Sequence, residues 1–153
     1  MPKPPSPSTQ LKAAELRRCV GFNLRQATRV VTQLYDGILR PSGLRSTQFS
    51  LLSVIGIREH VSITQLAEDA VMDRTTLTRN LDLLKREGLV RIQPRDDGRV
   101  RDVTLTPAAR HKLAVATPLW EKAQTHITKQ LGAGRVERLL ADLTTVVVGT
   151  QKT

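Results

Sequence analysis

A run of short polar and basic side chains between Asp73 and Asn80 has the chemistry needed to recognise nucleic acid. Its members carry hydroxyl, amide or guanidinium groups: Arg74, Thr75, Thr76, Thr78, Arg79 and Asn80. Hydroxyls bond to phosphates or base edges, and a guanidinium can hold guanine through two parallel hydrogen bonds. An ordinary solvated helix face does not need this mixture. The run therefore predicts a surface that fits the major groove of duplex DNA.

The apolar residues between and before these groups predict two helices. Three leucines recur at helical spacing and would turn the polar groups outward: Leu77, Leu81 and Leu84. Asp73 is expected to cap this helix, and Gly88 to end it in a left-handed conformation. A shorter helix over Ser62 to Asp69 has Ser62 as its N-cap and one apolar stripe. Together they predict a helix-turn-helix.

Two apolar-polar alternations follow and predict a β-hairpin. Residues Leu89 to Gln93 and Val100 to Leu105 are expected to be its strands, and Asp97-Gly98 is a strong turn signal between them. The hairpin would place three arginines around its tip: Arg95, Arg99 and Arg101. A guanidinium on such a wing can enter the electronegative minor groove.

The run MDRTTLTRNLDLLKREGLV, the basic Asp-Gly-Arg wing and LTPAAR together resemble the MarR family of transcription regulators. By order and spacing of elements, the resemblance covers nearly the whole chain. It implies a mainly α (α+β) fold, a winged helix-turn-helix with a two-stranded β-wing between N- and C-terminal dimerisation helices. It also implies that Thr75, Thr76, Thr78 and Arg79 face the major groove, that Arg99 is the wing arginine, and that Asp97 braces the wing. Two residues depart from common patterns, since Val71 and Ala109 stand where glycine is often found.

The flanking segments predict the domain organisation. Residues 1–9 are rich in proline and are expected to be a disordered tail, and residues 10–153 a single domain. Within it, 10–40 and 107–153 would be dimerisation helices, and 46–105 the winged DNA-binding region. The first is expected to be one helix of about 28 residues, too long for a small domain to cover alone. The second is expected to kink or break at Pro118 and to break at Gly132-Ala133-Gly134.

A core helix is expected between these regions. Pro41 and Gly43 would end the first long helix, and Ser46 or Thr47 would cap the next one, whose apolar residues continue to Ile57. Thr106-Pro107 is expected to start the helix after the wing.

Composition narrows the class of partner. The formal charge of +10 favours a polyanion, although a basic surface alone is equally consistent with a solvated face. Aromatic residues make up only 3% of the chain, which is unfavourable for stacking single strands. The sequence has neither a long apolar run nor a signal-peptide pattern, so we expect a cytoplasmic protein without membrane contact.

Enzymatic chemistry is poorly supported. The three histidines are scattered and lack ligand-spaced partners: His60, His111 and His126. The sequence has no glycine-rich phosphate loop and no recognisable nucleophile motif. We expect no enzyme activity, no metal site and no cofactor.

Cys19 and a set of aromatic residues are candidates for regulation. Some MarR-like regulators sense peroxide through a cysteine in the first helix, but Gly21 stands at that position here, and Cys19 lies about 200° away round the helix. Of the sensors' supporting tyrosines, Tyr35 matches one and Ser46 replaces the other. A passive thiol is the default and redox sensing the alternative. The resemblance also implies a small apolar or anionic effector, bound where the dimerising helices meet the winged region. Four aromatic residues are expected to be core individually and to line such a pocket collectively: Phe22, Tyr35, Phe49 and Trp120.

These patterns predict a sequence-specific, duplex-DNA-binding transcriptional regulator. By the resemblance it acts as a homodimer on a palindromic operator, with half-sites about one helical turn (~34 Å) apart, and as a repressor that a ligand releases. The rival hypotheses are a non-specific architectural DNA-binding protein, a winged-helix protein-interaction module and a cysteine-based redox-responsive regulator.

Overall fold

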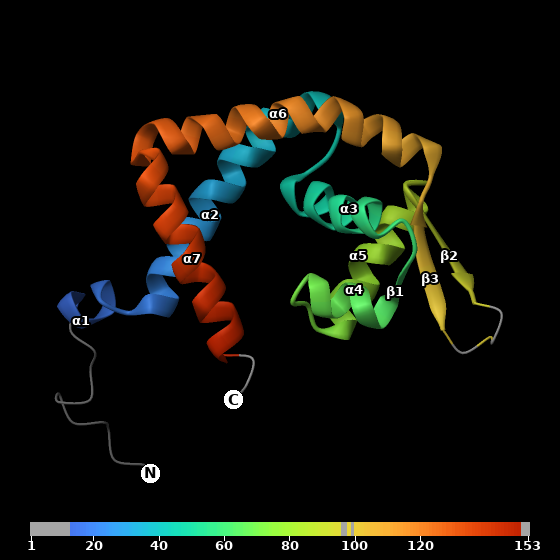
Figure 1. The fold of residues 1–153 in the computed structure, drawn as a ribbon, viewed down its shortest axis with the longest axis horizontal. Coiled ribbons are helices and arrows are strands. Elements are labelled where there is room, and N and C mark those ends of the chain that lie inside the picture. Colours follow the sequence, from blue (N-terminus) through green and yellow to red (C-terminus); the bar gives the residue numbers. More distant parts are fainter. Residues whose placement is uncertain (1–12, 96–97, 99, 151–153) are drawn as a thin grey trace, which may run out of the picture. The chain divides into compact units, whose positions relative to one another are not determined.

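The computed structural model describes residues 13–95, 98 and 100–150 (Figure 1). They fall into two compact units, one ending at Leu34 and the other beginning at Tyr35. The predicted tail over residues 1–9 lies outside the described residues. No helix in the described ranges is both long and apolar enough to span a membrane.

The first unit contains α1 (Ala13–Arg17) and most of α2 (Val20–Leu39). The prediction of one continuous helix was wrong, because the chain breaks at Arg18 and Cys19. The side-chain amide of Asn23 stabilises this break by donating to the carbonyl oxygens of Arg17 (2.8 Å) and Cys19 (2.9 Å). A polar side chain that bonds the backbone locally competes with helix continuation in this way.

The second unit is the predicted winged helix-turn-helix with long helices around it. Its elements are η2 (Arg40–Ser42), α3 (Ser46–Arg58), β1 (Val61–Ser62), α4 (Ile63–Asp69), α5 (Arg74–Arg86), β2 (Val90–Pro94), β3 (Arg101–Leu105), α6 (Pro107–Leu131) and α7 (Ala133–Thr150). The mainly helical fold class with a β-wing is confirmed. The antiparallel sheet has the strand order β1-β3-β2, and its short first strand was not predicted. Figure 1 shows β2 and β3 as a hairpin beside the helices.

A leucine-rich core fixes the orientation of the helices. The largest fully buried side chains are Leu39, Leu52, Ile55, Leu66, Leu77, Leu81, Leu84, Leu89 and Val103. The three leucines predicted to anchor α5 are among them. Ile57, predicted as core, is instead 83% exposed. It stands two residues after Ile55, about 200° round α3, and therefore faces away from the core.

Caps position α4, α5 and α6 as the sequence predicts. The Ser62 hydroxyl accepts from the Gln65 N–H (3.1 Å), and an Asp73 carboxylate oxygen accepts from the Thr76 N–H (2.9 Å). Gly88 follows α5 with φ of 69°. The Thr106 hydroxyl accepts from the Ala109 N–H (3.2 Å) and donates to the Gly88 carbonyl (2.7 Å). Thr106 thereby joins the end of α5 to the start of α6.

The predicted cap of α3 was wrong. Ser46 and Thr47 lie inside the helix, and Arg45 is its N-cap residue. Two other side chains accept from the free N–H groups of this end: Asp36 from Ser46 (2.7 Å) and Gln48 from Arg45 (3.0 Å). The N-terminus is therefore capped from α2 and from its own first turn.

Of the two outcomes expected at Pro118, a kink or an interruption, the interruption is absent, and the break after α6 is shorter than predicted. α6 continues through Pro118, so proline does not interrupt it. Proline leaves the carbonyl four residues earlier without its N–H partner. Here that residue is Ala114, which lies on an exposed part of the helix. Only Gly132, with φ of 86°, separates α6 from α7, and Ala133 and Gly134 are helical.

Candidate nucleic-acid interface

The outward face of α5 carries the predicted recognition residues. Those predicted to contact the major groove are all exposed: Arg74, Thr75, Thr76, Thr78 and Arg79. At about 100° per residue, Thr75 and Arg79 point nearly opposite the buried Leu77. Thr76 and Thr78 lie on the two flanks of this direction. The helix therefore presents a polar face whose centre is formed by one hydroxyl and one guanidinium.

Asp73 and Thr76 form a compact cap at the start of that face. One carboxylate oxygen accepts from the Thr76 N–H at 2.9 Å, and the other accepts from the Thr76 hydroxyl at 2.6 Å. The Thr76 hydroxyl, followed by its backbone N–H, lowers the pKa of Asp73 below its usual value. The carboxylate consequently stays charged at the N-terminus of α5, where its negative charge interacts favourably with the positive end of the helix dipole.

The remaining polar groups of the face differ in whether their donors are used. The Thr78 hydroxyl donates to the Arg74 carbonyl (2.8 Å), and the Asn80 amide donates to the Thr76 carbonyl (2.8 Å). In the part of the chain that the structure describes, the Arg74, Thr75 and Arg79 side chains make no hydrogen bond or ion pair. The face thus combines donors available to a ligand with hydroxyls bonded to their own helix.

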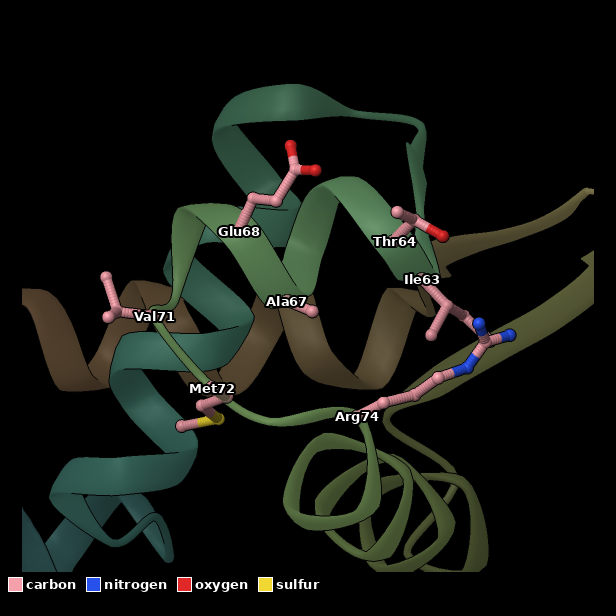
Figure 2. Close-up of a pocket in the computed structure, with 7 residues that line it drawn as sticks. All are labelled: Ile63, Thr64, Ala67, Glu68, Val71, Met72 and Arg74. Carbon is pink, nitrogen blue, oxygen red and sulfur yellow. The ribbon is translucent and has the colours of Figure 1, made fainter. Parts of the chain in front are cut away.

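Two adjoining cavities border the start of α5. One, of about 400 Å³, lies between α4 and α5 and is lined by Ile63, Thr64, Ala67, Glu68, Val71, Met72 and Arg74 (Figure 2). The other, of about 310 Å³, reaches the wing and is lined by Ser62, Ile63, Thr64, Arg74, Val100 and Arg101. Arg74 lines both, and in Figure 2 its side chain extends toward Ile63. Arg74 and Arg101 make the second cavity cationic, which suits a phosphate. Sequence reasoning missed Thr64 here.

The wing is stiffened by an ion pair that the sequence did not reveal. Arg95 donates two parallel hydrogen bonds to Asp102, at 2.8 and 3.0 Å. Asp102 is opposite Gln93 in the strand register, so β3 brings its carboxylate beside Arg95. Planar pairs of this kind fix geometry as well as charge. Gly98 takes the left-handed φ of 68° expected of the turn. The predicted wing residues Asp97 and Arg99 lie outside the described residues.

Three of the four aromatic residues proposed for an effector pocket belong to the core of the second unit or pack against it: Tyr35, Phe49 and Trp120. The Phe49 and Trp120 rings stack with centroids 6.2 Å apart, and Phe49 is buried. The Tyr35 hydroxyl donates to the Gln124 side-chain oxygen at 2.6 Å, and burial raises the pKa of Tyr35. Phe22 belongs to the first unit, where it is half-buried.

The remaining candidates from the sequence are a redox-active cysteine and a metal site. Cys19 is an exposed free thiol between α1 and α2. Over the described ranges, no three His, Cys, Asp or Glu side chains are grouped so that they could hold a metal ion.

Comparison with known proteins identifies the class. A model of the MarR family matches residues 42–100. The chain is 40% identical to the transcriptional regulator MosR of M. tuberculosis in its complex with DNA, covering 86% of this chain and 98% of that one, with a TM-score of 0.77. No significant match was found among curated proteins. Winged-helix fold, family model and sequence identity agree, and the chain belongs to the MarR family of transcriptional regulators.

More distant members have a similar fold. The transcriptional repressor CouR bound to a 23-mer DNA duplex is 26% identical, with 91% of this chain and 99% of that chain covered and a TM-score of 0.79. A mutant MarR from E. coli with operator DNA is 25% identical, with 83% and 92% covered and a TM-score of 0.76. CouR is also known bound to p-coumaroyl-CoA.

Proposed function

We propose that this protein is a homodimeric repressor that binds a palindromic operator in duplex DNA and releases it when an effector binds. The observation that carries the proposal is the exposed face of α5, whose central Thr75 and Arg79 have donors available to a ligand. The size of a helix and these donor groups both suit the major groove.

Each residue group has a distinct part in this proposal. The major-groove contacts come from Arg74, Thr75, Thr76, Thr78 and Arg79. Arg79 is the candidate for base recognition because its guanidinium has no partner in the described chain and can hold guanine through two bonds. On the wing, Arg95 and Arg99 contact DNA and Asp97 braces the hairpin. The pairing of Arg95 with Asp102 supports a bracing role for Arg95 as well.

The apolar surface of α7 supports a homodimer. The helix has no buried residue, and five of its large apolar side chains are 40–56% exposed: Leu139, Leu140, Val146, Val147 and Val148. A surface of this kind is typical of an interface. Two copies related by a two-fold axis would present two α5 helices to half-sites about one helical turn (~34 Å) apart, and the operator would be palindromic.

Release by an effector requires that the dimer can adopt two geometries, only one of which fits the operator. A ligand that prefers a spacing of the recognition helices unsuited to the operator weakens DNA binding by that preference. Tyr35 and Trp120 are partly buried against the core that contains Phe49, and this is where we propose that a small apolar or anionic molecule binds. CouR, a relative, has been found with an acyl thioester, p-coumaroyl-CoA, which motivates small acids and thioesters as test ligands.

The proposed role of Arg79 can be tested by substitution. Arg79→Ala should weaken cognate binding by about 1–3 kcal/mol per half-site and relax preference at one base pair in each, because each half-site loses one bidentate contact. Arg138→Ala removes the same charge from an exposed position on α7, about 200° round the helix from Leu140. It is the matched control, and sedimentation checks that it is still a dimer. Fluorescence anisotropy on cognate and scrambled duplexes would measure both. Equal losses on the two duplexes for Arg79→Ala would reduce Arg79 to a phosphate contact.

A further inference from the structure

The Thr78 side chain is held in one orientation by its own helix. Its hydroxyl lies 2.8 Å from the Arg74 carbonyl oxygen and donates its hydrogen there. The hydroxyl and the methyl are the two branches on the same carbon atom. Because the hydroxyl is turned back toward the preceding turn of α5, the methyl is directed away from that carbonyl. Thr78 is exposed, so this methyl meets solvent when no DNA is bound.

Thr75 provides the opposite case on the same helix. Its hydroxyl has no hydrogen-bond partner among the described residues, so it can donate to a phosphate oxygen or a base. Thr78 has already used its only hydrogen. A hydroxyl has one donor hydrogen, and a phosphate oxygen offers only lone pairs. Thr78 in this conformation is therefore unsuited to phosphate binding, although its residue type would allow it.

We propose that Thr78 is a specificity-determining residue that recognises thymine through methyl-methyl contact. The thymine C5-methyl projects into the major groove, and threonine methyl groups make apolar contacts with it. This inference rests on the proposed function, since α5 must enter the major groove. Thr76 is similarly bonded, but its hydroxyl also holds the Asp73 cap, so substitution there would disturb the helix as well.

The test pairs substitutions at residue 78 with removal of single methyl groups from DNA. The operator is first selected with the wild-type protein, and each thymine is then replaced in turn by uracil, which lacks the methyl. Thr78→Val keeps the methyl and replaces the hydroxyl, whereas Thr78→Ser keeps the hydroxyl and removes the methyl. Both variants are compared with wild type by circular dichroism and urea unfolding before affinities are measured.

One thymine position in each half-site should respond to residue 78. Uracil there should weaken binding by about fourfold per half-site for wild type and for Thr78→Val, the effect of losing one buried methyl-sized group. For Thr78→Ser the same replacement should change binding by less than about twofold, because the protein methyl is already absent. Thr75→Ser and Thr75→Val give the contrast: only the valine variant should lose affinity, since Thr75 is expected to act through its hydroxyl.

The outcomes separate this inference from the proposed function. If wild type selects an operator but no uracil effect depends on residue 78, or if the effect survives in Thr78→Ser and disappears in Thr78→Val, the methyl contact is refuted and operator binding stands. If wild type binds every duplex equally, the proposed function and this inference both fail.

Discussion

Val71 adopts a left-handed backbone, with φ of 51°, at the end of α4. The chain closes there with two hydrogen bonds, from the Val71 N–H to the Glu68 carbonyl and from the Met72 N–H to the Ala67 carbonyl. This is the Schellman pattern. The end of α5 has the same pattern with Gly88 at the left-handed position. A β-branched residue is therefore held where glycine is ordinarily preferred, in the turn that sets α5 against α4.

Replacing Val71 by glycine should stabilise the protein. A left-handed conformation costs an L-residue about 1–2 kcal/mol. Glycine removes that strain but loses up to about 1 kcal/mol through the greater freedom of the unfolded chain. Val71 is 55% exposed, so the loss of apolar burial is small. We expect Val71→Gly to raise the free energy of unfolding by about 0.5–1 kcal/mol.

Urea unfolding followed by circular dichroism, at one fixed protein concentration, measures this difference. Val115→Gly is the matched control, because Val115 is 40% exposed and lies in the ordinary helix α6. Glycine should destabilise there by about 0.5–1 kcal/mol. The two variants should thus change stability in opposite directions. A Val71→Gly protein as destabilised as Val115→Gly would refute the assignment of strain to this turn.

Two further predictions concern caps. Thr106→Val should lower the free energy of unfolding by about 2 kcal/mol in the same urea assay. The Ala109 N–H would lose its acceptor and the Gly88 carbonyl would lose its donor. An unchanged midpoint would contradict this prediction. The pKa of Asp73 is lowered in the folded protein by Thr76, so its contribution to stability is complete above the ordinary carboxyl value and is lost as pH falls through the lower folded pKa. Below about pH 4, Asp73→Asn should therefore lose less stability on acidification than wild type, and identical acid profiles would refute the cap's electrostatic contribution.

Periodicity and caps made the winged region predictable. Leucines at helical spacing identify the buried side of α5, and Asp73 and Gly88 mark its two ends, because each of these residue types has a strong conformational reason to be there. The wing strands were placed to within about one residue for the same kind of reason. β1 was missed because its two residues are too short for an alternation to be seen.

The errors arise where a long-range or side-chain contact decides the local structure. The break before α2 depends on Asn23 bonding back to Arg17, and the cap of α3 depends on Asp36, ten residues before Ser46. Residue composition does not encode such pairings. α6 likewise continues through Pro118, where the sequence left open whether proline would kink the helix or interrupt it.

The residue types of the candidate interface were visible in the sequence, but which of its side-chain donors are already used in hydrogen bonds was not. Residue types between Asp73 and Asn80 predict a DNA-binding face, yet they do not distinguish the Thr75 hydroxyl from that of Thr78. The distinction comes from rotamers, which follow from helix geometry and local acceptors. The ion pair between Asp102 and Arg95 was not predicted, because it depends on the strand register of the wing.

Selection from a random duplex library at physiological salt, followed by affinity measurement on the selected and on a scrambled duplex, tests the central claim most directly. A homodimeric reader of base sequence should select a palindrome with half-sites about one helical turn apart and bind it at least about 1,000-fold more tightly than the scrambled duplex. Little enrichment, with the same salt dependence on every duplex, would contradict sequence recognition by α5 and favour a non-specific architectural protein.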